Sequence, residues 1–249
     1  MKTVSLSRDL IHTGNLILIN GRYPYRETAA NRSLVALEEG IRLERQVAAV
    51  YTKLMEALSA REQIVAVSGW RSREEQEQIY RESLLENGAD FTTKYVALPG
   101  HSEHQTGLAV DLALQQEEID FLCPHFPNTG ICGDFREKAG YFGLIERYPQ
   151  NKEDITGIAY EPWHFRYVGA PHGMIMQCTG DTLEEYHARL KQHPYGEKPM
   201  QYAFDGLKIE VGYLPAEDET TEFEIAADAS YAVSGNNMDG FIVTLAVWV

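Results

Sequence analysis

The sequence predicts an α+β protein, in which a mixed body of helices and strands is followed by a short β-rich segment. Three observations support this class. Helix-like and strand-like patterns succeed one another through residues 1–194 without an internal repeat, the composition changes after Pro194, and β-prone stretches separated by turn residues fill the remainder. We therefore expect two domains, a main domain over 1–194 and a small β-rich extension over 195–249 that packs on it.

Two segments near the N-terminus show clear apolar patterns. Residues 15–20 (NLILIN) are largely apolar and are followed by Gly21, which is typical of a buried strand that ends in a turn. Residues 33–60 contain no proline and a single glycine, and their apolar side chains recur at the spacing of one helix face. We expect a strand over 15–20 and one long amphipathic helix over 33–60.

A strand and a capped helix follow. Residues 64–67 (IVAV) indicate a core strand. Ser72 is a typical N-cap residue, Glu75 stands three positions later, and Gly88 is placed where helices often end. This pattern predicts a helix over 73–87.

The rest of the chain alternates loops, short strands and helices. In the main domain we expect a loop over 89–103, a buried strand over 107–114, irregular chain over 117–133, a short helix over 134–141, a strand over 162–168 and a last helix over 182–192. In the extension, β-prone stretches cover 207–214, 221–227 and 242–249.

The composition excludes some classes of function. Hydrophobic residues make up 44% of the chain, which argues against disorder. The formal net charge of −15 argues against a nucleic-acid partner, because phosphate contacts require a basic surface.

The cysteines and the N-terminal segment bear on the compartment. Cys123, Cys132 and Cys178 are odd in number and form no CxxC pair, so we expect reduced thiols rather than a disulfide framework. The apolar run over 16–19 is too short for a signal sequence, and no stretch reaches the roughly 20 apolar residues of a membrane span. We therefore expect a cytoplasmic protein without a membrane span.

Asp111 is an ionisable residue inside an apolar strand pattern, LAVDLAL. Because an unpaired buried carboxylate is costly, a metal, an arginine or a set of donors has to neutralise it. His104 precedes it on the turn into the strand, and His164 offers an imidazole from another strand, so the three make up the protein ligands of a catalytic zinc site. Asp111 could be a metal ligand or a partner in a buried salt bridge. The spacing also does not show whether His101 or His104 is the ligand.

Three further residues suit hydrolysis at such a metal. Glu161 stands three residues before His164, where it could take a proton from an attacking water and pass it to the leaving amine. Arg71 follows a core strand, and its guanidinium could stabilise an oxyanion or grip a substrate carboxylate. Gln76, on the next helix, could donate hydrogen bonds nearby.

Three sequence blocks together carry a family resemblance. SGWRS, SEHQTGLAVDL and EPWHFRYVG resemble the signature of the zinc D-alanyl-D-alanine carboxypeptidases and dipeptidases, the family of the vancomycin-resistance enzymes VanY, VanX and VanXY. By this resemblance His104, Asp111 and His164 are zinc ligands, and His101 is not. Glu161 is then the catalytic base.

The resemblance also assigns the remaining site residues and a substrate. It implies that Arg71 stabilises the scissile carbonyl and that Ser102 and Gln76 contact substrate. The implied fold is a compact α+β catalytic domain with an antiparallel sheet and flanking helices, related to the hedgehog signalling domain. The implied reaction is hydrolysis of the terminal D-Ala-D-Ala bond in the free dipeptide, in the peptidoglycan pentapeptide precursor, or in both. Lack of an anchor makes the chain look most similar to the VanXY type.

Several alternatives stay open from the sequence. They are an anchored-type D,D-carboxypeptidase that trims only the pentapeptide, a peptidoglycan endopeptidase, and a non-enzymatic hedgehog-like zinc-binding domain. Manganese or iron would also accept this ligand set. The extension over 195–249 could complete the core, cap the cleft or form a homodimer.

Overall fold

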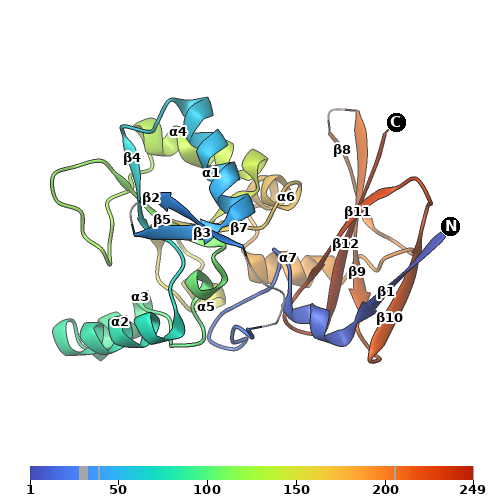
Figure 1. The fold of residues 1–249 in the computed structure, drawn as a ribbon, viewed down its shortest axis with the longest axis horizontal. Coiled ribbons are helices and arrows are strands. Elements are labelled where there is room, and N and C mark those ends of the chain that lie inside the picture. Colours follow the sequence, from blue (N-terminus) through green and yellow to red (C-terminus); the bar gives the residue numbers. More distant parts are fainter. Residues whose placement is uncertain (28–32, 39, 205, 249) are drawn as a thin grey trace. The chain divides into compact units, whose positions relative to one another are not determined.

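The computed structural model describes residues 1–27, 33–38, 40–204 and 206–248 (Figure 1). The chain divides into two compact units, one formed by Ile19–Thr182 and the other by Met1–Leu18 together with Leu183–Val249. The expected division after residue 194 therefore differs from the observed one, which falls after Thr182. The α+β class is confirmed in both its parts, helices with an antiparallel sheet and a β-rich C-terminal region.

A four-stranded antiparallel sheet forms the centre of the larger unit, in the order β4-β5-β7-β6. Its strands are β4 (Ile64–Ser68), β5 (Ala109–Leu114), β7 (Glu161–Tyr167) and β6 (Leu144–Tyr148). The helices of the unit are α1 (Arg45–Leu58), α2 (Arg73–Glu86), α3 (Ala89–Tyr95), α4 (Gly130–Ala139), α5 (Glu153–Thr156) and α6 (His172–Thr179), with 3-10 turns η2 (Glu103–Thr106) and η3 (Gly140–Phe142). A hairpin of β2 (Leu34–Glu38) and β3 (Ile41–Glu44) precedes α1.

The register of the central strands separates a core face from a polar face. Val110 and Leu112 of β5, and Trp163 and Phe165 of β7, belong to the hydrophobic core. Because successive side chains of a strand point to opposite faces, Asp111 lies on the other side, where β5 and β7 place it directly opposite His164.

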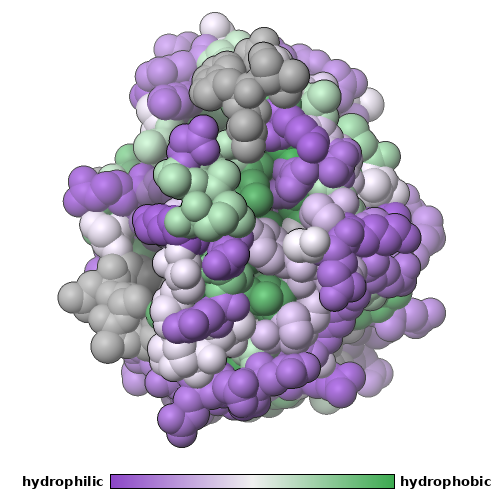
Figure 2. All heavy atoms as spheres, turned by 90° about the vertical axis from the view of Figure 1, so that its right-hand side faces the viewer, coloured by the Kyte–Doolittle hydropathy of each residue, from purple (hydrophilic) through white to green (hydrophobic). Residues whose placement is uncertain are grey.

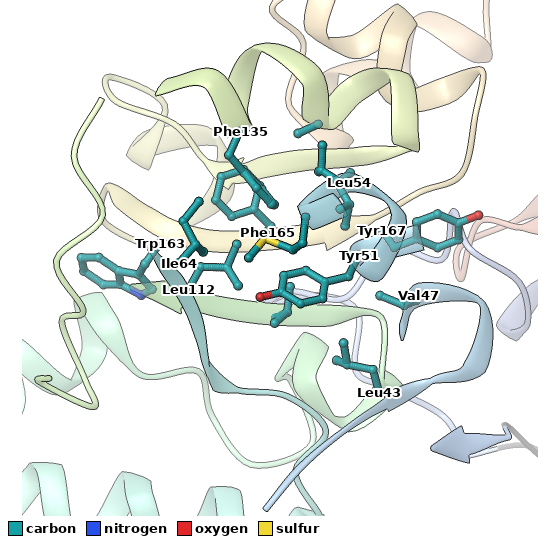
Figure 3. Packing of buried hydrophobic residues seen from close by; sticks show 14 of the residues in the cluster. Leu43, Val47, Tyr51, Leu54, Ile64, Leu112, Phe135, Trp163, Phe165 and Tyr167 are labelled. Atoms are coloured by element: carbon teal, nitrogen blue, oxygen red, sulfur yellow. The ribbon is translucent and has the colours of Figure 1, made fainter. Parts of the chain in front are cut away.

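The core lies between the sheet and two helices, α1 and α4, which pack against each other. Figure 3 shows Phe135 of α4 beside Phe165 of β7, and their ring centroids are 4.9 Å apart in an edge-to-face arrangement. Leu54 of α1 is fully buried in the same cluster. This packing fixes the strands that carry the polar face.

Five predicted elements of the main body are confirmed. The strands expected over 64–67, 107–114 and 162–168 correspond to β4, β5 and β7, and the helices expected over 73–87 and 182–192 correspond to α2 and α7 (Leu183–Leu190). At the start of α2 the Ser72 side chain accepts from the Glu75 amide, and the Glu75 carboxylate accepts from the Ser72 amide. The capping box read from the sequence is thus present.

The long helix predicted over 33–60 is wrong in the part before Arg45. The hairpin of β2 and β3 occupies that part, with Gly40 in the left-handed conformation at a φ of 78°. The helix begins only at Arg45, because the Glu44 carboxylate accepts the amides of Gln46 and Val47 and caps it. The apolar spacing of this segment therefore serves two elements rather than one.

The strand predicted over 15–20 is also wrong, although the segment is buried. Its backbone groups are satisfied outside any ladder: the Leu16 amide donates to the Ser234 hydroxyl at 2.9 Å, and the Leu16 carbonyl lies 2.7 Å from Nε2 of His187. An apolar run indicates burial, but burial does not require a strand.

Other differences concern short elements. Helix α3 lies in the segment expected to be a loop over 89–103, and α4 begins at Gly130 rather than at residue 134. Strand β6 and helices α5 and α6 were not predicted.

The smaller unit combines both ends of the chain. Strand β1 (Lys2–Ser7), followed by η1 (Arg8–His12), pairs antiparallel with β10 (Thr220–Ile225). A second sheet has the order β11-β12-β9-β8, formed by β11 (Ser230–Gly235), β12 (Gly240–Trp248), β9 (Leu207–Pro215) and β8 (Met200–Phe204). The three predicted β stretches match β9, β10 and β12, with Val249 outside the described residues. Because β1 completes the pair with β10, the unit cannot consist of the C-terminal extension alone.

The surface is largely hydrophilic on the face shown in Figure 2, where hydrophobic residues appear mainly in recesses between polar ones. This pattern agrees with the strong net negative charge of the sequence. Within the described part of the chain, no helix has the length and hydropathy required to cross a lipid bilayer.

Replacing Phe165 with alanine should lower the free energy of unfolding by about 3–5 kcal/mol, because the vacated volume lies in a fully packed core. Urea unfolding of chelator-treated protein followed by circular dichroism measures this loss. As a control, Tyr141→Ala at a position 60% exposed should change the free energy by less than about 0.5 kcal/mol. A loss below about 1 kcal/mol for Phe165→Ala would contradict its place in the core.

Candidate metal centre and active site

Three buried side chains meet on the polar face of the central sheet. His104, Asp111 and His164 each offer one ligand atom, and these atoms all lie within 4.8 Å of one another. Asp111 and His164 face each other across β5 and β7, whereas His104 comes from η2. Gly107 ends this turn with a φ of 72°, and a Cβ there would lie 2.8 Å from Leu34, so glycine is needed where the chain turns into β5.

His104 is held by its backbone and by its ring. The Ser102 hydroxyl accepts from the His104 amide and caps η2. Nδ1 of His104 lies 2.6 Å from the Gly69 carbonyl, which can only accept, so Nδ1 carries the proton. The lone pair of Nε2 then points into the cluster, 3.1 Å from Oδ2 of Asp111.

His164 is oriented the other way round. Its Nδ1 faces the cluster, 2.8 Å from Oδ1 of Asp111, and its Nε2 points away from it. Burial would lower the pKa of His164, but the carboxylates of Asp111 and Glu103 raise it to about 9. A positive charge is therefore favoured at this point, and a proton on His164 and a metal ion would compete for it.

Electrostatics keep Asp111 ionised. Burial alone would raise the pKa of its carboxyl group, but the neighbouring imidazoles of His104 and His164 hold this pKa well below its usual value. Burial and the nearby Arg71 guanidinium lower the pKa of His104 to about 4, so His104 is neutral near pH 7 and its lone pair is available. An anionic carboxylate and a neutral imidazole are the forms in which these residues bind metals.

Arg71 contributes a fixed guanidinium beside the cluster. It donates to Ser68 Oγ, to Gln76 Oε1 and to Asp111 Oδ2, each at 3.0 Å. Gln76 also donates to the Ala97 carbonyl at 2.8 Å, so it links Arg71 to the loop beyond α3. For Asp111, the salt bridge that the sequence left open as an alternative to a ligand role is therefore present together with the histidine cluster.

Glu161 begins β7 and is only 6% exposed. Its Oε2 lies 4.0 Å from Nδ1 of His164, which puts the carboxyl group next to the cluster. Burial raises the pKa of Glu161 to about 8, and the negative charge of Asp111 adds to this effect. In contrast to Asp111, Glu161 is therefore able to take up and release a proton near neutral pH.

An open cavity of about 510 Å³ brings the predicted residues together. It is lined by all seven of them: Arg71, Gln76, Ser102, His104, Asp111, Glu161 and His164. Hydrophobic side chains, including Phe121 and Trp163, form part of its wall. His101 is not among the lining residues, and its Nδ1 lies 2.7 Å from the Asn20 carbonyl.

Sequence reasoning missed a group of charged residues behind the cluster. Glu103, Arg147 and Arg166 are fully buried, and Glu103 forms an ion pair with each of the two arginines. Glu103 is part of the SEHQTG block, so its position next to His104 could have marked it as a residue near the metal cluster. Its partners are distant in the sequence, and no local pattern marks them as charges of the interior.

The chain is similar in sequence to known proteins. The sequence profile of VanY, D-alanyl-D-alanine carboxypeptidase, matches residues 40–170. The bifunctional D-Ala-D-Ala dipeptidase and D-Ala-D-Ala carboxypeptidase VanXYC of Enterococcus gallinarum is 42% identical over 181 residues, which cover 71% of this chain and 95% of that protein.

Solved structures are similar as well. The vancomycin-resistance D,D-dipeptidase VanXYg, in complex with a D-Ala-D-Ala phosphinate analogue, has a TM-score of 0.95 and 47% identity over 99% of both chains. A mutant of the D,D-pentapeptidase VanY in complex with Zn(II) has a TM-score of 0.57 and 30% identity, covering 70% of this chain and 98% of that one.

These similarities place the chain among the peptidases. It belongs to the VanY family of D-alanyl-D-alanine carboxypeptidases, as the SGWRS, SEHQTGLAVDL and EPWHFRYVG blocks predicted.

Replacing Glu161 with glutamine should raise the unfolding temperature of the metal-free protein at pH 8. The folded-state pKa of about 8 lies above the usual 4.5, so between these values the folded protein keeps a proton that the unfolded chain releases. The free energy of unfolding of the wild type therefore falls as the pH rises from 4.5 to 8. Glutamine abolishes this loss. The difference in unfolding temperature between variant and wild type should therefore grow from pH 5 to pH 8 in chelator-treated protein.

A matched control is Glu137→Gln, at an exposed position of α4. It should show no such growth with pH. An equal pH dependence of the two variants would contradict the effect assigned to the burial of Glu161.

Proposed function

We propose that this chain is a zinc-dependent D,D-peptidase that hydrolyses the terminal D-Ala-D-Ala bond of the free dipeptide, of the peptidoglycan pentapeptide precursor, or of both. The observation that carries the proposal is the convergence of His104, Asp111 and His164 in a cavity that Glu161 and Arg71 also line. The similarity over 99% of the chain to a D,D-dipeptidase that binds a D-Ala-D-Ala phosphinate analogue supports the choice of substrate. The larger unit would be the catalytic domain.

The residues present fit a zinc ion. Two imidazole nitrogens and one carboxylate oxygen are donors that zinc accepts, and three protein ligands leave a position for water or substrate. The Gly69 carbonyl prepares one of the imidazoles for this role. The Zn(II) complex of the related VanY supports zinc over manganese or iron.

The reaction can be followed through the residues of the chain. The chemistry that a bound zinc supplies is Lewis acidity toward the scissile carbonyl and the attacking water. Glu161 takes a proton from that water on its carboxylate and delivers it to the nitrogen of the leaving D-alanine. A metal cation close to Glu161 would offset the burial that raises its pKa, so the base is ionised when the site is loaded.

Arg71 supplies the second positive charge of the cavity. Its guanidinium is held by Ser68 and Gln76, so it does not have to be ordered during the reaction. It stabilises the oxyanion that forms from the scissile carbonyl. Ser102 and Gln76, both on the cavity wall, hold the substrate through their polar side chains. The cytoplasmic location stays a prediction, and a homodimer stays one of the roles open to the extension.

The purified protein should release D-alanine from free D-Ala-D-Ala, from the muramyl pentapeptide precursor, or from both, and a chelator should abolish the release. An enzyme-coupled D-alanine assay measures this. Cleavage of both substrates assigns the bifunctional type, and cleavage of one assigns the narrower type. Zinc-loaded protein that releases no D-alanine from either substrate would contradict the proposed function and favour an endopeptidase or a binding domain.

If His104 is a ligand and Glu161 is the base, replacing them should affect zinc binding and turnover differently. His104→Ala should lose both zinc and activity, because it removes a ligand. Glu161→Gln should retain zinc and lose at least about 100-fold in turnover, because it removes only the proton transfer. Zinc content by atomic emission and D-alanine release measure the two effects.

The control for this split is His101→Ala, three residues from His104 and outside the cluster. It should retain zinc. Loss of the metal in His101→Ala, or in Glu161→Gln, would show that the ligand assignment is wrong.

A further inference from the structure

Glu103 is a carboxylate with no exposed side-chain surface, held between two arginines that are equally buried. Its Oε1 lies 2.9 Å from Nε of Arg147 on β6 and 2.7 Å from Nη1 of Arg166 on β7. Removing three charges from water costs several kcal/mol for each ion, and an apolar cluster of similar volume is often as stable. Stability alone therefore gives little reason for such a triad.

The second oxygen of Glu103 points toward the metal cluster. Oε2 lies 3.5 Å from Nε2 of His164, and neither of these two buried atoms has a hydrogen-bond partner among the described residues. A carboxylate oxygen only accepts, and a ring nitrogen that carries a proton donates. The two atoms therefore complement each other, at a separation slightly longer than a hydrogen bond.

The elements that carry the triad are also those that carry the ligands. Glu103 immediately precedes His104 in η2, and Arg166 follows His164 by two positions in β7, hence on the same face of the sheet. The ion pair between Glu103 and Arg166 thus connects the segments that hold the two imidazoles. A shift of either segment would disturb both the triad and the ligand geometry.

The two imidazoles need opposite tautomers. His104 turns Nε2 toward Asp111, and the Gly69 carbonyl accepts from its Nδ1. His164 turns Nδ1 toward Asp111, so for Nδ1 to bind a metal through its lone pair the proton has to reside on Nε2. On that side the acceptor within reach is Oε2 of Glu103.

We propose that Glu103 is a positioning residue for the metal centre. Its carboxylate accepts a hydrogen bond from the Nε2–H group of His164, and this keeps the Nδ1 lone pair free for the ion. Arg147 and Arg166 hold the carboxylate in the orientation that this requires. The proposal rests on the metal site of the proposed function, but on none of its catalytic steps. In other metal sites, loss of such a partner weakens metal binding by about 10- to 100-fold.

The variant Glu103→Gln tests this role with little change in volume. Its amide oxygen can still accept from both arginines, which leaves the NH₂ group facing Nε2 of His164. That nitrogen must then accept, and the proton moves to Nδ1, where it blocks the metal. We expect the zinc dissociation constant, measured by competition with a fluorescent chelator, to rise about 10- to 100-fold.

A matched control separates this role from a structural one. Glu146→Gln weakens another ion pair of the same unit, in which Oε2 of Glu146 lies 2.6 Å from Nε of Arg136. Glu146 contacts none of the three ligands in the described structure. Glu103→Gln should weaken zinc binding, whereas Glu146→Gln should bind zinc as tightly as the wild type.

A spectroscopic measurement on the wild type makes the test independent of whether Glu103→Gln folds. In zinc-loaded protein labelled with ¹⁵N, His164 should be metal-bound through Nδ1 and should show an Nε2 proton protected from solvent exchange. Coordination through Nε2, or a zinc affinity of Glu103→Gln within twofold of wild type, would overturn the positioning role. Wild-type protein that binds no zinc would overturn the proposed metal site itself, which is a different result.

Discussion

The antiparallel register of β5 and β7 is the constraint on which the rest of the site depends. It places Asp111 directly opposite His164, while the alternate residues Val110 and Phe165 fill the core. A slip of one residue would turn the carboxylate into the hydrophobic core and an apolar side chain into the cavity, so the packed core protects the register strongly. The same packing that stabilises the larger unit thus sets the distance between the two strand-borne ligands.

Three buried carboxylates around this register differ in their partners, and their chemistry differs accordingly. Glu103 is held by two arginines, and Asp111 by two imidazoles and Arg71. Both keep pKa values below the usual range despite burial. Glu161 lies 4.0 Å from His164 and has no shorter ion pair among the described residues, and burial raises its pKa to about 8. In the proposed function, residues of one chemical type would therefore serve as a fixed anchor, a ligand and a proton carrier because their surroundings differ.

The sequence predicted which residues line the cavity better than it predicted the elements around them, and the reason is physical. A carboxylate inside an apolar strand, such as Asp111, needs a partner, and this can be recognised from neighbouring residues alone. The capping box at Ser72 likewise marks the start of a helix from neighbouring residues alone. Residues 15–20 and 33–44 were misjudged because apolar spacing reports burial without naming the partner that satisfies the backbone. Glu103 was missed for a related reason: the residues that make its burial tolerable, Arg147 and Arg166, are on strands far along the chain.

The connectivity of the chain explains how the site can be self-contained. Strand β1 pairs with β10, so both chain ends belong to the smaller unit, and the larger unit is one continuous segment between them. Residues 40–170, which define the family, fall wholly inside that segment. The three proposed ligands, the proposed base and the buried triad also fall inside it. The residues proposed to form the metal site therefore all come from one continuous segment of the chain, whose central sheet also sets their register.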